Sequence, residues 1–344
     1  MLKTIGFDAF AFRMQTYGGI SKQFEEIINR INQGKYSNSI EAVITEHIPE
    51  VWQERLHAES IARDSSNKRI VNAGLRRLPR SQQHKLDLWH LTYYHKAPLV
   101  FPRTPFAITV HDFTPEIFPE LMEQSNVHLK KMELINKASL IFCVSETTKQ
   151  HLLHFFPRLP EDKIKIAYPG PSIEKTQRQI SGARPYFLIV GRNDRYKNLE
   201  VILRAIPHFL EYDFIFFGLS KSEIPRKYLI QSGNQIFCMT GNSELLAMYY
   251  HGAEAYLNPT LSEGFCIPVL DALVSNCPTL VSDIKVFHEL YGNSVGYFDP
   301  KNLESLIESI KHLNSIKLQP FNTEKFTWAK SVEVHVRSYL ELLN

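Results

Sequence analysis

Short apolar runs alternate with amphipathic stretches along the chain, and this alternation is typical of βα units that build parallel sheets. In the first half the apolar runs predict strands at Thr4–Phe7, Ser39–Ile44, Leu86–Leu91, Phe106–Val110 and Ser139–Val144. In the second half they predict strands at Tyr186–Val190, Asp213–Phe217, Gln235–Met239, Ala255–Asn258 and Pro278–Ser282. The pattern therefore predicts an α/β protein.

Two helices and one boundary complete the predicted organisation. Gly18-Gly19 opens a helix with apolar residues at helical spacing, and Trp328–Leu343 reads as a final amphipathic helix. Proline and glycine in Tyr168–Ser172, with the polar stretch that runs to Pro185, predict a hinge. We therefore expect two Rossmann-like domains, residues 1–172 and 183–327, with the helix 328–344 packed back on the first.

Composition narrows the class of protein. At 344 residues, 44% hydrophobic and 22% charged, the chain suits two soluble globular domains. A net charge of +3 gives no reason to expect nucleic acid as a partner, and the four cysteines show no CxxC spacing, so we expect reduced thiols and no metal site. Neither a signal peptide nor a membrane-spanning run is evident, which predicts a cytoplasmic protein, or one attached only to a membrane surface.

Polar clusters follow several predicted strands, at the edge where parallel sheets bind ligands. After Ala255–Asn258, a tight loop leads through Glu263, Gly264 and Phe265 to Pro268, which suits the first turn of a helix. Backbone N–H groups of Phe265, Cys266 and Ile267 would face an anion there, with Glu263 and Asp271 on either side. An ordinary strand–helix junction with two solvated acids fits this segment equally well.

Three further segments place candidate chemistry at strand ends. Gly191 and Arg192 follow one strand and Lys197 begins the next helix, so two cations would neutralise a diphosphate; solvated loop cations are the alternative. His111 and Asp112 directly follow the strand that ends at Val110. A histidine at such a strand end is more often a satisfied hydrogen-bonding residue than a catalyst. Gly18 and Gly19 form a glycine loop that serves either ligand approach or close packing.

These segments together resemble the family 4 glycosyltransferases, which are retaining enzymes of the GT-B fold. The resemblance runs in order through most of the chain, and Glu263 and Asp271, with seven residues between them, occupy the family's E-x7-E element. Val110–Phe113 and Val144–Thr148 are similar to the branch that builds bacterial surface polysaccharides and O-antigen, including many mannosyltransferases.

The resemblance implies a role for each matching position. His111 would contact the transferred sugar, Arg192 and Lys197 would hold the diphosphate, Glu263 would meet the sugar hydroxyls, and Asp271 would accept from the ribose. The expected donor-binding set is Gly18, Gly19, Gly191, Arg192, Lys197, Glu263, Gly264, Phe265, Cys266, Ile267 and Asp271. The expected catalytic set is Glu263, Lys197, Arg192 and His111, in a central cleft between the two sheets and without a metal or cofactor.

Two positions depart from the family pattern, and other functions stay open. Asp271 stands where Glu is usual, and Cys266 replaces a common glycine. The resemblance implies a nucleotide sugar as the donor, and the branch implies a GDP-linked sugar such as GDP-mannose, with UDP- and dTDP-linked donors as alternatives. The acceptor that it implies is a saccharide or lipid-linked saccharide. A nucleotide-sugar epimerase of the same fold and a non-catalytic nucleotide-sugar-binding scaffold are the rival functions. A dehydrogenase is disfavoured because no G-x-G-x-x-G follows the first strand.

A basic stretch suggests where the protein works. Residues 63–85 carry seven cations and one acid, interleaved with apolar residues. Such a stretch fits an anionic membrane surface on the cytoplasmic face, and a solvated charged loop is the alternative of equal weight.

Overall fold

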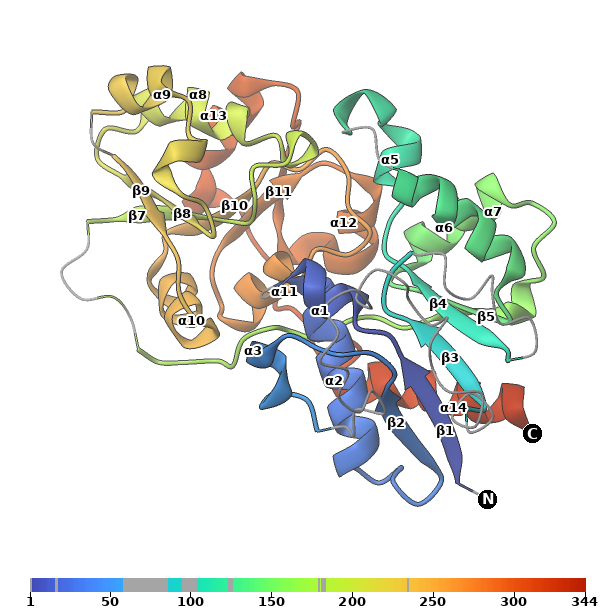
Figure 1. Cartoon of the computed structure of the whole chain (residues 1–344). Helices are drawn as coiled ribbons and strands as arrows, with labels where there is room; N and C mark the ends of the chain where they lie inside the picture. Colours follow the sequence, from blue (N-terminus) through green and yellow to red (C-terminus); the bar gives the residue numbers. More distant parts are fainter. Residues whose placement is uncertain are drawn as a thin grey trace. The chain divides into compact units, whose positions relative to one another are not determined.

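Two six-stranded parallel sheets form the frame of the protein (Figure 1). The structure, a computed structural model, describes residues 2–15, 18–57, 86–94, 104–122, 126–178, 180, 184–233 and 235–344. The chain divides into two compact units. Unit 1 contains Met1–Asp112, Gln124–Gly170 and Phe326–Asn344, and unit 2 contains Phe113–Glu123 and Pro171–Lys325.

The sheet of unit 1 has the strand order β2-β1-β3-β4-β5-β6. The order reverses beside β1, so the carboxyl ends of β1 and β3 meet at a switch point of the kind where ligands of open α/β sheets bind. The strands are β1 (Lys3–Phe7), β2 (Ile40–Ile44), β3 (Leu88–Leu91), β4 (Phe106–Val110), β5 (Leu140–Cys143) and β6 (Ile164–Ile166).

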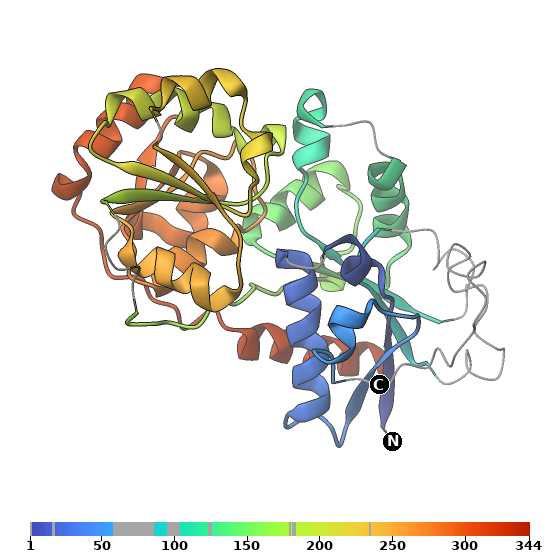
Figure 2. The same ribbon diagram turned by 60° about the vertical axis from the view of Figure 1, so that its left-hand side comes forward.

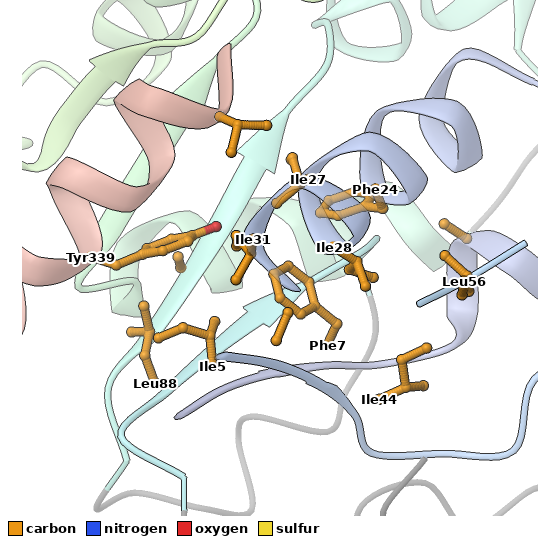
Figure 3. Close-up of a cluster of buried hydrophobic side chains, with 14 of the residues drawn as sticks. Ile5, Phe7, Phe24, Ile27, Ile28, Ile31, Ile44, Leu56, Leu88 and Tyr339 are labelled. Carbon is orange, nitrogen blue, oxygen red and sulfur yellow. The ribbon is translucent and has the colours of Figure 1, made fainter. Parts of the chain in front are cut away.

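Helices α2 (Gly19–Gln33) and α14 (Trp328–Leu343) pack on each other and on the sheet of unit 1. Tyr339 of α14 lies in one apolar cluster with Phe24 and Ile27 of α2 and with the β1 residue Phe7 (Figure 3). The last helix therefore completes the core that the first residues begin. The described ranges of unit 1 also contain the helices α1 (Phe10–Met14), α3 (Glu50–Gln53), α6 (Asn126–Lys137) and α7 (Glu146–Phe155).

The sheet of unit 2 has the order β12-β11-β10-β7-β8-β9, and helices cover both of its faces (Figure 2). Its strands are β7 (Tyr186–Val190), β8 (Asp213–Phe217), β9 (Ile236–Met239), β10 (Ala255–Asn258), β11 (Thr279–Ser282) and β12 (Gly296–Phe298). Its helices are α5 (Thr114–Ile117), α8 (Leu199–Ala205), α9 (Arg226–Gln231), α10 (Ser243–Gly252), α11 (Ile267–Val274), α12 (Lys285–Tyr291) and α13 (Leu303–Lys311).

The predicted fold class is confirmed, and every strand expected from the apolar pattern is present within two residues. Two strands were not anticipated: β6 and β12, each three residues long and each at the edge of its sheet. The predicted domain boundary also differs in one place. Phe113–Glu123, assigned from the sequence to the first domain, lies in unit 2, where the Thr114 and Ser262 hydroxyls are 2.9 Å apart.

Close contacts hold distant segments of unit 1 together. Asp8 is fully buried and accepts hydrogen bonds from the backbone N–H groups of Phe10 and Thr92, both at 2.8 Å, and from the Thr92 hydroxyl at 2.6 Å. Gly170 lies so close to α14 that a Cβ there would be 2.6 Å from the Trp328 nitrogen.

The chain has three tryptophans, Trp52, Trp89 and Trp328, and all are buried in unit 1.

Candidate functional site

Two loops of unit 2 meet at the carboxyl ends of neighbouring strands. One follows β7 and contains residues 191–198, the other follows β10 and contains residues 259–266, and β7 pairs with β10. The Leu261 N–H donates to the Tyr196 carbonyl at 2.8 Å, and the Asn198 side-chain amide donates to the Pro259 carbonyl at 3.0 Å. These two hydrogen bonds fix the two loops against each other.

Lys197 and Glu263 form an ion pair across these loops. Lys197 Nζ donates to Glu263 Oε1 at 2.5 Å, and the two side chains are 20% and 13% exposed. Burial on its own would lower the pKa of Lys197, but the attraction and hydrogen bond of the Glu263 carboxylate, together with the contributions of Tyr196 and Cys266, raise that pKa well above its ordinary value. The ammonium is therefore charged at every physiological pH.

Arg192 is paired as well, but at the surface. Its guanidinium donates to Asp194 Oδ2 from Nε at 3.1 Å and from Nη2 at 2.9 Å, and its side chain is 67% exposed. Gly191, directly before it, has φ of 138°, a conformation that L side chains rarely adopt. Both cations that the sequence assigned to a diphosphate are thus held by carboxylates of unit 2.

The loop from Glu263 through Gly264 into α11 has a fixed backbone. Cys266, directly before α11, has φ of 71°, and the Tyr291 hydroxyl lies 3.1 Å from the Phe265 carbonyl oxygen and 3.2 Å from that of Cys266. In a trans peptide the N–H points opposite to the C=O. The N–H groups of Cys266 and Ile267 therefore point away from Tyr291, as two adjacent donors at the positive end of the helix.

The Cys266 side chain is part of the interior. Its sulfur accepts from the Asn258 amide at 3.2 Å, and the same amide donates to the Tyr256 hydroxyl at 2.8 Å. Burial raises the pKa of the Cys266 thiol, with the Glu263 carboxylate acting in the same direction. The thiol is therefore neutral and serves packing.

Asp271 lies in the second turn of α11 but is already occupied. Its side chain is 1% exposed, Oδ1 accepts from the Ser172 N–H at 2.7 Å, and Oδ2 accepts a short hydrogen bond from the Ser172 hydroxyl. In this structure Asp271 ties the start of unit 2 to α11. A ribose at this carboxylate would have to displace Ser172.

His111, in unit 1, follows β4 and is held by its backbone. Its N–H donates to the Tyr94 hydroxyl at 3.3 Å, and Lys131, which is 1% exposed, donates to the Asp112 carbonyl at 3.0 Å. Burial lowers the pKa of His111 to about 4; the Asp112 carboxylate opposes this shift and the Lys131 ammonium adds to it. Within the described part of the chain its Nε2 is buried and has no hydrogen-bond partner. A neutral imidazole with an unused nitrogen suits hydrogen bonding to a neutral hydroxyl.

The first glycine loop is also in unit 1. Gly18 has extended backbone and precedes α2, which begins at Gly19. The Gly18 carbonyl accepts from the Lys22 N–H and from the Ser21 hydroxyl, both at 3.0 Å, and so closes the first turn of the helix. The predicted opening of a helix at Gly18-Gly19 is confirmed, with Gly18 directly before α2 and Gly19 as its first residue.

Unit 2 thus brings together Lys197, Glu263 and the Phe265–Ile267 backbone, whereas His111 and the two glycines belong to unit 1. Sequence reasoning missed Asp194, Ser172, Tyr291 and Lys131. Asp194 had a local signal, since it is two residues after Arg192. The other three act through partners between 19 and 99 residues away, for which the sequence holds no local signal.

Two further expectations concern metals and membranes. Among the described residues, no group of three His, Cys, Asp or Glu side chains is placed to hold a metal ion. No helix of the described ranges has the length and apolar character needed to cross a membrane. The basic stretch 63–85 lies outside the described residues.

Two family models match adjoining parts of the chain. The model described as "Glycosyltransferase Family 4" matches residues 35–175, and the one described as "Glycosyl transferases group 1" matches residues 172–322. The crystal structure of Anabaena Alr3699/HepE in complex with UDP and glucose has a TM-score of 0.69 at 14% identity, over 98% of this chain and 99% of that chain. The two Rossmann-like units therefore have the GT-B fold.

The chain belongs to the family 4 glycosyltransferases. The O-antigen chain mannosyltransferase RfbU of Salmonella typhimurium is 27% identical over 65% of this chain and 64% of its own length. O-antigen chain mannosyltransferase B of Escherichia coli is 23% identical over 66% of each chain. The chain therefore spans a little under two thirds of the length of these curated relatives.

Proposed function

We propose that this protein is a retaining glycosyltransferase that moves a hexose from a nucleoside-diphosphate sugar to a saccharide or lipid-linked saccharide. Family membership supports the reaction class. The observation that carries the proposal is the Lys197–Glu263 pair beside the start of α11, since it places a permanent cation, a carboxylate and two backbone donors together in unit 2.

Charge stabilisation is the main chemical contribution of these groups. As the bond from the sugar to the diphosphate breaks, negative charge grows on the leaving phosphate, and Lys197, Arg192 and the N–H groups of Cys266 and Ile267 are the donors that stabilise it. The acceptor hydroxyl attacks the same face of the sugar. Because the attack comes from the face that the diphosphate leaves, the anomeric configuration is retained. The proton of the acceptor hydroxyl passes to the departing phosphate oxygen, so no protein general base is required. Proton NMR of the first product distinguishes this outcome from inversion.

Mannose is the proposed sugar because the relatives named above are O-antigen chain mannosyltransferases. GDP is the proposed nucleotide, from the resemblance of the His111 and Ser145-Glu146 segments to that branch. A thermal-shift panel of GDP, UDP and dTDP tests it, since a ligand that binds only the native state raises the melting temperature. Stabilisation by UDP alone would indicate a UDP-linked sugar as the donor. No change in melting temperature with any of the three nucleotides would count against a donor site.

Removal of the Lys197 charge tests the assigned chemistry. Lys197→Ala is expected to lower transfer by about a hundredfold or more, because its charge stabilises the leaving phosphate most in the transition state. Release of GDP from GDP-mannose is the measurement. Lys175→Ala, which removes an exposed cation of the same unit, is the control. Wild-type turnover by Lys197→Ala would refute the role.

The basic stretch 63–85 motivates a prediction about the acceptor. Attachment to an anionic leaflet gains roughly 1 kcal/mol per well-placed cation, so co-sedimentation with anionic vesicles is expected to exceed that with neutral vesicles and to weaken in high salt. Charge reversal of Arg76, Arg77 and Arg80 should abolish it. Binding that is absent on anionic vesicles, or that ignores this reversal, would leave the stretch as an ordinary solvated face.

A further inference from the structure

The two cations of the proposed donor site are already neutralised from within unit 2. Glu263 accepts from Lys197 at 2.5 Å, and Asp194 accepts from both Nε and Nη2 of Arg192. A carboxylate and a phosphate present the same kind of oxygen acceptors to these donors. A diphosphate that binds here therefore meets cations whose charge-assisted hydrogen bonds are already made.

The Lys197 pair resists solvent and salt more than an ordinary surface pair. Its side chains are 20% and 13% exposed, against 67% and 34% for Arg192 and Asp194. The Tyr196 carbonyl, next to Lys197, accepts from Leu261 N–H, and this bond holds the two loops in register. Glu263 thus competes with an incoming anion at close range, and Asp194 does so more weakly.

We propose that Glu263 and Asp194 are place-holders for the donor diphosphate. When the diphosphate binds, Lys197 and Arg192 exchange their carboxylate partners for phosphate oxygens, and Glu263 becomes available to the hydroxyls of the sugar. This proposal rests on the proposed function and assigns Asp194 a role in the affinity for the nucleotide. The proposal predicts opposite effects of one change: removal of the Glu263 charge tightens the binding of the nucleoside diphosphate and impairs transfer of the sugar.

Isothermal titration of GDP into the wild-type chain and three variants tests the exchange. Glu263→Gln is expected to lower the Kd for GDP by about five- to tenfold and Asp194→Asn by about two- to fivefold. In each variant the phosphate no longer has to break an ion pair in order to bind the cation. Glu244→Gln is the matched control, because Glu244 also pairs with an exposed arginine of unit 2, Arg178. Its Kd is expected to stay unchanged.

A double-mutant cycle separates place-holding from general electrostatics. If Glu263 acts by occupying Lys197, the tightening by Glu263→Gln disappears in a Lys197→Ala background. If the effect is only one of net charge, it persists there. Persistence of the full tightening in that background overturns the proposal.

The outcomes keep this proposal distinct from the one on which it rests. If no member of the series GDP, UDP and dTDP binds the wild-type chain, the proposed donor site fails, and the place-holders fail with it. If one of them binds and Lys197→Ala weakens it, the donor site stands. In that case equal or weaker binding by both Glu263→Gln and Asp194→Asn overturns the place-holders alone. Asp194, at the surface, keeps the test valid even where Glu263→Gln does not fold.

Discussion

Cys266 occupies a backbone conformation that favours glycine. Its φ of 71° costs a residue with a Cβ about 1 kcal/mol or more, while its buried sulfur contacts the Asn258 amide. Cys266→Gly removes both effects, so we expect the free energy of unfolding to change by less than about 1 kcal/mol and transfer to stay within a few-fold. Urea unfolding and the rate of GDP release are the measurements.

A branched side chain at the same position provides the contrast. Cys266→Val introduces a larger side chain that is branched at Cβ and resists positive φ, so it is expected to destabilise the protein by about 1–3 kcal/mol more than Cys266→Gly. Equal stability of the valine and glycine variants would show that the conformation of this residue is not strained.

At this scale the sequence indicated kinds of residue better than their partners. The strand ends predicted which cations and carboxylates gather in unit 2, and Lys197 and Glu263 do meet there. That they pair with each other across 66 positions depends on how two loops fold together. Likewise, nothing near Asp271 in the sequence points to Ser172, 99 positions away, as the group that occupies its carboxylate.

Strands and helices were more accessible, because their signal is local. A buried parallel strand of four or five apolar residues is visible as a run, as in Tyr186–Val190. The edge strands Ile164–Ile166 and Gly296–Phe298 are only three residues long and include a lysine and a glycine, so their membership depends on the neighbour they pair with. The amphipathic period of Trp328–Leu343 predicted that helix to the residue.

The junction of α14 with the rest of unit 1 supplies a prediction at the scale of elements. In Gly170→Ala the new Cβ would lie 2.6 Å from the Trp328 nitrogen, a backbone atom that moves only with the helix. We expect a loss of about 1–3 kcal/mol in the free energy of unfolding, measured by urea unfolding. Lys175→Ala, at an exposed position nearby in the chain, serves as control. A Gly170→Ala protein as stable as wild type would mean that α14 shifts freely.

The molecule as a whole carries an acid-sensitive core in unit 1. His90 hydrogen bonds through Nδ1 to the Tyr339 hydroxyl at 2.5 Å and through Nε2 to the Thr109 hydroxyl at 3.0 Å, and His335 packs on Phe142 with ring centroids 4.0 Å apart. Burial lowers the pKa of His90 well below its ordinary value and that of His335 to about 4. Both rings are neutral in the folded protein at pH 7.

The sign of the pH dependence follows from linkage. Below the unfolded-state pKa of about 6.5 the unfolded chain binds protons that the folded core excludes, so stability is full above that pH and falls toward pH 4. His335 alone contributes about 3 kcal/mol to this loss. Urea unfolding by circular dichroism across this range measures it. In His335→Leu the loss is expected to be smaller, and an unchanged pH profile would refute the assignment.

The distribution of tryptophan has a spectroscopic consequence. Because Trp52, Trp89 and Trp328 all lie in unit 1, selectively excited indole emission reports on that unit and leaves the other optically silent. Denaturation followed by this emission tracks unit 1, while ellipticity averages over both. Unit 2 contributes no indole, so a change in emission on adding GDP would report an altered environment of the tryptophans of unit 1.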